Sequence, residues 1–140
     1  MNNNNKKYEL TNESIKVDEH TLYRIKALKD FDNIHAGDLG GWIESENNLS
    51  HECYCWVAGN AMVYGNAKVY GNARIFCDAQ VYGNAKIYGH AYVYENARVY
   101  GNAEVYDNAF IHGNVDVYNS KIYGNASFKS RGLISGCHIF

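Results

Sequence analysis

The sequence predicts an all-β fold, a solenoid of short strands preceded by a small β cap. A six-residue unit, Val-Tyr-Gly-Asn-Ala-x, recurs through the second half of the chain, and a short fixed period is typical of a solenoid. Within each unit small, polar, branched and aromatic residues alternate, as in a short strand with one buried face. The 140 residues include no proline and no low-complexity linker, so one elongated domain is expected.

Each position of the repeat has a predicted place. Ala and Val point inward, while the variable residue and Tyr point outward. The Gly-Asn pair forms the corner, because both residues reach the left-handed region at low cost. We therefore expect Asn66, Asn84 and Asn102 to stack in one column in left-handed conformation. Three units make a coil of about 18 residues, with strands about 4.8 Å apart.

This pattern resembles the left-handed parallel β-helix of the hexapeptide-repeat superfamily, which has an aliphatic residue first and a small residue fifth. The family usually has Gly in the second position. Here Tyr takes that position and Gly comes third, a departure that changes the outer surface and leaves the core unchanged.

The same phase extends towards the N-terminus. It places the helix at residues 37–140, as about five to six coils. Counting back in sixes from Ala61 and Val57 assigns the inward positions of the first coils to Cys55, Leu49, Ile43, His51, Ser45 and Leu39. One step is short, because five residues separate Val117 from Ile122, which predicts a corner near Asn119 that lacks one residue.

Residues 1–36 are predicted to form a β cap, with strands at 8–11 and 21–28 and a turn at 30–33. Solenoid ends expose unpaired backbone, so terminal segments usually cover them. The segments 22–28 and 37–44 also resemble a block that precedes hexapeptide repeats in small proteins of bacteriophages and prophages. Most of those relatives have no assigned activity.

Composition excludes several classes of function. The formal net charge of −2 gives no indication of non-specific nucleic-acid binding. No apolar run approaches the length of a membrane span, and the first seven residues lack the apolar core of a signal peptide. We expect a cytoplasmic protein with no membrane contact.

The four cysteines do not predict a metal site. Cys53, Cys77 and Cys137 fall at different corners or several coils apart, and Cys55 takes an inward position. The spacing of Cys53 and Cys55 is not that of a zinc ligand pair, because their side chains diverge on an alternating backbone. Reduced structural thiols are expected, and no cofactor is predicted.

The resemblance implies one enzymatic alternative, since many hexapeptide-repeat proteins are acyl-CoA-dependent acyltransferases. Those enzymes act as trimers and use a histidine as general base. His90 and His112 are the candidates here, although His90 replaces Asn at a corner and His112 replaces Tyr in a ladder. We expect no inserted loop between Leu39 and Phe140, and such loops usually build the acceptor pocket.

The outward positions suggest two binding surfaces. An aromatic, weakly charged face is the predicted interface of a homotrimer, with the residues Trp56, Phe76, Tyr92, Tyr94, Phe110 and His112. A second face alternates cations and rings, and could hold a nucleotide or a short nucleic acid through Lys68, Tyr70, Lys86, Tyr88, Lys121 and Tyr123. Glu104, in the middle of that face, weakens the second reading.

The sequence therefore favours a non-catalytic, self-associating binding protein over an acyltransferase. The phage resemblance implies a protein that blocks a bacterial defence component or sequesters a nucleotide signal. Whether the target is a protein or a small molecule stays open at this stage, as does the question of whether residues 1–36 only cap the helix or also bind.

Overall fold

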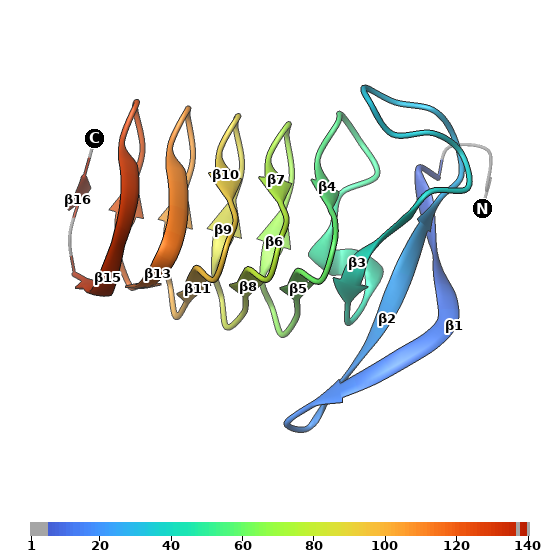
Figure 1. The fold of residues 1–140 in the computed structure, drawn as a ribbon, viewed down its shortest axis with the longest axis horizontal. Helices are drawn as coiled ribbons and strands as arrows, with labels where there is room; N and C mark the ends of the chain where they lie inside the picture. Colours follow the sequence, from blue (N-terminus) through green and yellow to red (C-terminus); the bar gives the residue numbers. More distant parts are fainter. Residues whose placement is uncertain (1–5, 137, 140) are drawn as a thin grey trace.

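The protein forms a parallel β-solenoid with a β-hairpin at its N-terminal end (Figure 1). The computed structural model describes residues 6–136, 138 and 139. Within this part of the chain the one helical segment is a 3-10 turn at Glu46–Asn48, and no helix is long and apolar enough to cross a membrane.

The hairpin consists of β1 (Tyr8–Val17) and β2 (His20–Ala27), paired antiparallel. Strand β3 (Leu39–Ile43) continues this sheet by pairing antiparallel with β2, and it also pairs in parallel with Met62 and Val63 of the solenoid. Strand β1 runs six residues beyond the predicted 8–11. The extension has a physical reason, because Ile15 and Val17 pack against a small cluster that includes Leu22 and Tyr64.

The solenoid strands are short. They are β4 (Trp56–Val57), β5 (Met62–Val63), β6 (Lys68–Val69), β7 (Arg74–Ile75), β8 (Gln80–Val81), β9 (Lys86–Ile87), β10 (Tyr92–Val93), β11 (Arg98–Tyr100), β12 (Glu104–Val105), β13 (Phe110–Tyr118), β14 (Lys121–Ile122), β15 (Ser127–Ser135) and β16 (His138–Ile139). Strands β13 and β15 each continue around a corner and so take part in two faces.

Each strand pairs in parallel with the strand one coil further on, which gives three flat faces. We call β4, β7, β10 and the start of β13 the aromatic face, and β6, β9, β12, β14 and β16 the lysine face. The third face contains β3, β5, β8, β11 and the end of β13. Pairs such as Val63 with Val81 show the predicted 18-residue coil.

The core follows from the alternation of side chains. Small and branched residues of the repeat lie inside the prism with almost no exposure, and they include Ala67, Val69, Ala73, Ile75, Ala79, Val81, Ala85, Ile87, Ala91, Val93, Ala97 and Val99. Alanine lets the walls approach at each corner, and the branched residue fills the middle of each side. The predicted inward positions are confirmed for this part of the chain.

The corners correct one prediction. The left-handed residue is the third of each unit, with φ of 66° at Gly65, 68° at Gly83 and 66° at Gly101, and Asn66, Asn84 and Asn102 are not in that region. Asn66 and Asn84 instead donate their backbone N–H to the glycine carbonyl of the next coil, as in Asn84 to Gly101 at 2.8 Å. One left-handed residue is enough to turn this corner.

The corner after Val117 is short, as predicted. Strand β12 pairs with β14 through Val105 and Ile122, a displacement of seventeen residues. Asn119 takes the left-handed conformation, with φ of 51°. Its side-chain oxygen accepts the backbone N–H of Asn102 at 2.7 Å. The amide side chain thus replaces the carbonyl that a full-length corner would supply.

The first coil departs from the predicted phase. Ile43 pairs with Val63, and Leu49 with Val69, so both take the branched position instead of the small one. Eight residues separate Leu49 from Val57, whereas six separate the corresponding Val69 and Ile75. The chain therefore contains a two-residue insertion within residues 50–55, contrary to the expectation that no loop is inserted.

This insertion explains which inward assignments failed. Leu39 is 57% exposed, while Ser45 and His51 lie outside the core cluster. Cys55 is buried, as predicted. In place of a regular strand, the buried Asn48 side chain donates to the carbonyl of Ala67 at 2.8 Å and accepts the N–H of Ser45 at 2.9 Å.

Replacing Gly83 with valine should destabilise the solenoid. A Cβ atom there would lie 2.9 Å from the backbone nitrogen of Gly101, and a branched residue at φ of 68° is strained. We expect Gly83→Val to lower the free energy of unfolding by about 1–3 kcal/mol in chemical denaturation. Asn84→Val, at the next exposed position, is the matched control and should cost less. Equal costs for the two variants would contradict this assignment of the corner.

Candidate functional site

Three columns of stacked rings run along the solenoid. On the third face Tyr64, Tyr82 and Tyr100 stack with centroids 5.1 and 5.0 Å apart. On the aromatic face Phe76, Tyr94 and His112 stack at 4.7 and 4.6 Å. The column of the lysine face contains Tyr70, Tyr88, Tyr106 and Tyr123. The fixed register of the coils places each ring directly over the next, where stacking stabilises the sheet.

This stacking bears on the predicted ligand face. The rings of Tyr70, Tyr88 and Tyr123 direct their faces at ring neighbours 4.8 to 5.1 Å away, so mainly ring edges are available to a nucleobase. The Tyr88 hydroxyl donates to Glu104 at 2.9 Å, and burial together with this bond raises the pKa of Tyr88. The lysines of this face could contact a phosphate, but the tyrosine rings leave little surface on which a base could stack.

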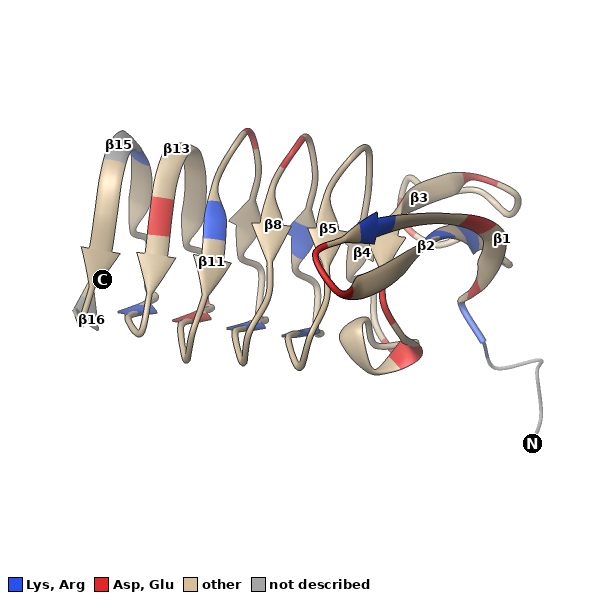
Figure 2. Ribbon diagram, turned by 90° about the horizontal axis from the view of Figure 1, so that it is seen from below, with Lys and Arg blue, Asp and Glu red and all other residues tan. Residues whose placement is uncertain are grey.

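The cations of that face form a row along the solenoid. Lys68, Lys86, Glu104 and Lys121 occupy the same position of successive coils. Figure 2 shows a row of short blue and red segments along the lower side of the solenoid. A carboxylate between two ammonium groups relieves their mutual repulsion. An ordinary solvated face has the same arrangement.

The aromatic face has a different surface. Its rings occupy both outward positions of successive strands, because Tyr92 and Phe110 stack at 5.1 Å beside the column that contains Tyr94. Phe76 meets Tyr92 edge-on at 5.9 Å. Tyr92 and Phe110 are 37% and 39% exposed, which is high for large rings that lie side by side. Neighbouring rings thus form much of the outer surface of this face.

Trp56 does not belong to this surface, and its prediction as an exposed interface residue was wrong. The ring is 1% exposed, because Phe31 and Tyr8 of the cap pack edge-on against it at 5.3 and 6.3 Å. The cap lies over the first coil of the aromatic face and leaves the later coils open. The exposed surface is therefore formed by Phe76, Tyr92, Tyr94, Phe110 and His112.

A hollow of about 350 Å³ lies where the cap meets this face. It is lined by Asn33, Ile34, Trp56, Ala58, Arg74, Ile75, Phe76 and Tyr92. Arg74 forms an ion pair with Asp32 and donates to Asn33 at 3.2 Å, so the cap loop is fastened to the solenoid beside the hollow. The apolar surface thus ends in a concave region.

His112 has a carboxylate partner that the sequence analysis missed. Its Nδ1 lies 2.9 Å from Glu95, and this contact leaves Nε2 with the lone pair when the ring is neutral. Glu95 occupies a corner position where the repeat has glycine, and its φ is 59°. A strained residue that orients a histidine suits both a structural and a catalytic role. His90, the other candidate, lies at an exposed corner between β9 and β10.

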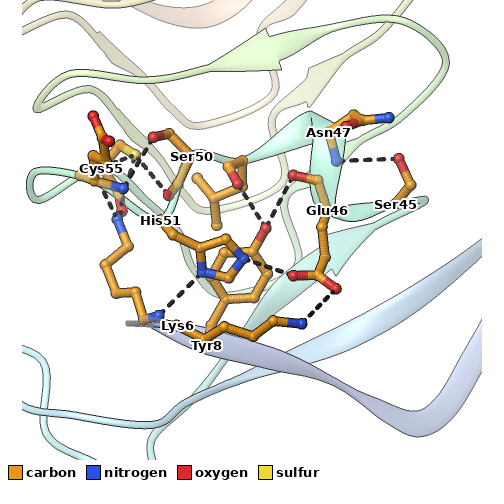
Figure 3. A network of polar contacts seen from close by, with 11 residues as sticks. Lys6, Tyr8, Ser45, Glu46, Asn47, Ser50, His51 and Cys55 are labelled. Carbon is orange, nitrogen blue, oxygen red and sulfur yellow. Dashed lines mark hydrogen bonds and ion pairs between the residues drawn. The ribbon is translucent and has the colours of Figure 1, made fainter. Parts of the chain in front are cut away.

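The cap is fastened to the first coil by a network of polar contacts (Figure 3). Glu46 accepts from Lys6 at 3.2 Å and from Nε2 of His51 at 2.7 Å. Nδ1 of His51 accepts the backbone N–H of Lys7 at 3.0 Å, which fixes the tautomer with the proton on Nε2. The Tyr8 ring stacks on His51 at 4.2 Å. Both ring nitrogens of His51 are thus engaged in structure.

A second contact fastens the hairpin. Glu44 accepts from Nδ1 of His20 and, at 2.8 Å, from the backbone N–H of Gly65. Burial raises the pKa of Glu44 and of Glu46, but hydrogen bonds from His20 and His51 outweigh it, so both carboxyl pKa values lie below their usual value near 4.5. Ionised carboxylates hold the cap in place.

The described residues contain no group of three or more His, Cys, Asp or Glu side chains that could hold a metal ion. Cys53 and Cys77 are exposed and Cys55 is buried, all three with free thiols. Cys137 lies outside the described residues.

The fold and its ladders define a β-solenoid repeat protein, and two comparisons agree with that class. Residues 97–118, which include His112, match the family model described as the YdcK beta solenoid repeat. A stretch of 47 residues is 43% identical to a protein of Escherichia coli strain K12 named "Uncharacterized acetyltransferase YdcK". That stretch is 33% of this chain, and it spans only 14% of the length of the relative.

Acid should release the cap from the solenoid. Because the pKa values of Glu44 and Glu46 are lowered on folding, their stabilisation is complete above about pH 4.5 and is lost as the pH falls through the lower values of the folded state. We expect the fluorescence of Trp56 to report exposure below about pH 4. Glu44→Gln and Glu46→Gln should each weaken this transition, and Glu9→Gln, on exposed β1, should not. A transition unchanged in both variants would contradict the role of these carboxylates.

Proposed function

We propose that this protein is a binding protein that self-associates through the aromatic face. The observation that carries the proposal is the pair Tyr92 and Phe110, two large rings that lie together on a flat surface with more than a third of each exposed. Apolar surfaces of this kind mark protein interfaces. Burying them contributes about 25 cal/mol for each Å² removed from water.

A homotrimer is the assembly we propose. Flat prism faces pack side by side around a threefold axis, and closed symmetry avoids open-ended growth. The hexapeptide-repeat resemblance supports the same arrangement. The hollow beside Phe76 offers a place for side chains of a neighbouring copy, since its walls include Ile34 and Tyr92.

The target of the assembled protein is proposed from the resemblance of residues 22–28 and 37–44 to phage and prophage proteins. Such a protein would block a bacterial defence component or sequester a nucleotide signal. For a nucleotide, Lys68 and Lys86 would contact phosphate, and the stacked rings beside them would contribute their edges. A protein target would bind outside the aromatic face, because the proposed trimer buries that face.

Phe110→Glu should dissociate the oligomer. The substitution places a charge in an apolar contact, which costs far more than the loss of one ring. Light scattering at micromolar concentration should show a trimer for the wild type and a monomer for the variant. Tyr70→Glu, a ring of similar exposure on the lysine face, is the matched control and should remain a trimer. A monomeric wild-type protein would refute the proposal, and a trimeric Phe110→Glu would place the interface on another face.

Acyl transfer is the second candidate, and one observation favours it. His112 is oriented by Glu95 within the segment that matches the solenoid repeat, and the similar protein of E. coli is named an acetyltransferase. In this reaction Nε2 of His112 would remove a proton from the acceptor while the acceptor attacks the thioester carbonyl of acyl-CoA. Glu95 would stabilise the resulting imidazolium, which then gives its proton to the CoA thiolate as the C–S bond breaks.

Calorimetry with acetyl-CoA separates the two candidates. For a non-catalytic binding protein we expect no measurable binding. Micromolar binding, with acetyl transfer that falls at least about a hundredfold in His112→Ala and less in Glu95→Gln, would establish the second function instead. His90→Ala is the control, since His90 lies at an exposed corner between β9 and β10 and its loss should leave any activity unchanged.

A further inference from the structure

The Lys7 amine and the Cys55 thiol meet in the buried contact between cap and solenoid. Figure 3 labels Cys55 in the same network. Nζ of Lys7 donates to the carbonyl of Cys55 at 2.6 Å and lies 3.4 Å from its Sγ. The Lys7 side chain is almost fully buried, with 1% of the residue exposed, and it lies over the Phe31 ring at 5.0 Å. Cys55 has no exposed surface.

This lysine has an unusual set of partners. Besides Cys55, it meets the carbonyls of Cys53 and Glu52 at 3.4 and 3.5 Å, and no ion pair joins it to a carboxylate of the described residues. Burial lowers the pKa of the Lys7 amine, which increases the fraction of neutral, nucleophilic amine. Burial also raises the pKa of the Cys55 thiol.

The thiol is held in a defined orientation. It donates to the carbonyl of Ser50 at 3.4 Å, while its sulfur accepts from Lys7. The amine nitrogen therefore already lies against the atom with which it would react. Residues 50–55 contain the two-residue insertion, and Cys53 within it has a left-handed φ of 57°. A loop of this kind moves more readily than a regular coil, which allows nitrogen and sulfur to approach.

We propose that Lys7 and Cys55 are the site of an oxidative cross-link, a sulfenamide bond between Nζ and Sγ. One molecule of hydrogen peroxide oxidises the thiol to a sulfenic acid and releases water. The amine then attacks the sulfur, the S–OH bond breaks, and the nitrogen loses one proton as a second water leaves. In sum, one thiol, one amine and one peroxide give one S–N bond and two waters.

The buried site lies close to an open hollow of the surface. An open hollow of about 820 Å³ lies beside the inserted loop and is lined by Lys29, Asp30, Phe31, His51, Glu52, Cys53, Tyr54 and Asn72. Phe31 and Cys53 are shared between this hollow and the surroundings of Lys7. The hollow therefore adjoins two residues that contact Lys7, and we expect a small oxidant to reach Cys55 from it when the loop moves.

The bond would be a reversible covalent cross-link between the cap and the solenoid. It joins the start of β1 to the first coil, so the hairpin could no longer separate from the solenoid without unfolding. Cross-links that close long loops stabilise proteins by restricting the unfolded chain. Trp56, covered by Tyr8 and Phe31, would stay buried in the oxidised protein under conditions that release the cap of the reduced one.

The test uses the full chain with Cys53, Cys77 and Cys137 replaced by serine, which leaves Cys55 as the single thiol. After treatment with hydrogen peroxide, intact mass spectrometry should show a monomer that has lost two hydrogens. No internal disulfide can form in this variant. Digestion and peptide mapping should then find the peptides of Lys7 and Cys55 joined, and dithiothreitol should separate them.

The melting midpoint gives an independent readout. Oxidation should raise it by roughly 5–10 °C, and dithiothreitol should reverse the change. Lys7→Arg keeps a cation at the site but removes the reactive amine, so it should show neither the mass change nor the shift. Cys55 recovered as a sulfinic acid, with the Lys7 peptide unmodified, would overturn the proposal. The peptide result from the variant that retains Lys7 decides the matter even if Lys7→Arg fails to fold.

Discussion

Backbone hydrogen bonds between successive coils hold each residue above its counterpart in the coil below, and this register determines almost everything on the surface. The N–H of Lys68 reaches the carbonyl of Ala85 at 3.0 Å, and the N–H of Tyr88 reaches Val105 at the same distance. Because these bonds repeat along every side, the position of a residue in the repeat determines which side chains lie next to it. The neighbours of each side chain are the residues at the same position one coil away, about 4.8 Å along the axis.

Side chains on such a scaffold are arranged in columns. A residue type can recur along a column only if neighbouring copies of it, one coil apart, do not repel one another. Aromatic rings gain from repetition because they stack, so the tyrosine position can recur in every coil. Cations do not, and Glu104 interrupts the column of Lys86 and Lys121. The pairing of Glu95 with His112 joins adjacent columns, since Glu95 lies beneath the corner at Gly113, and His112 is the neighbour of Gly113 in the chain. The position of a residue in the repeat thus determines which side chain it contacts.

Much of this arrangement can be predicted from the sequence, because a six-residue period assigns every side chain from Ala61 onward to the inside or the outside. The first coil could not be predicted in this way. The two-residue insertion shifts the six-residue phase, but the alternation of apolar and polar residues around Leu49 looks the same with or without it. The burial of Trp56 depends on contact with Phe31, which lies 25 residues earlier and outside the repeat. The contact of Glu95 with His112 was within reach, because the substitution of glycine by glutamate at one corner was visible in the repeat.

The short corner at Asn119 shows how the solenoid absorbs change in chain length. One missing residue is compensated within a single corner by the Asn119 side chain, and β12 and β14 still pair in register. A complete extra coil would be accommodated even more simply, as another layer with the same three sides. The separation between the cap hollow at Trp56 and the His112–Glu95 pair is therefore set in discrete steps of about 4.8 Å. Insertion or deletion of one whole coil would therefore change this separation by one step, and the order of the residues along each face would stay the same.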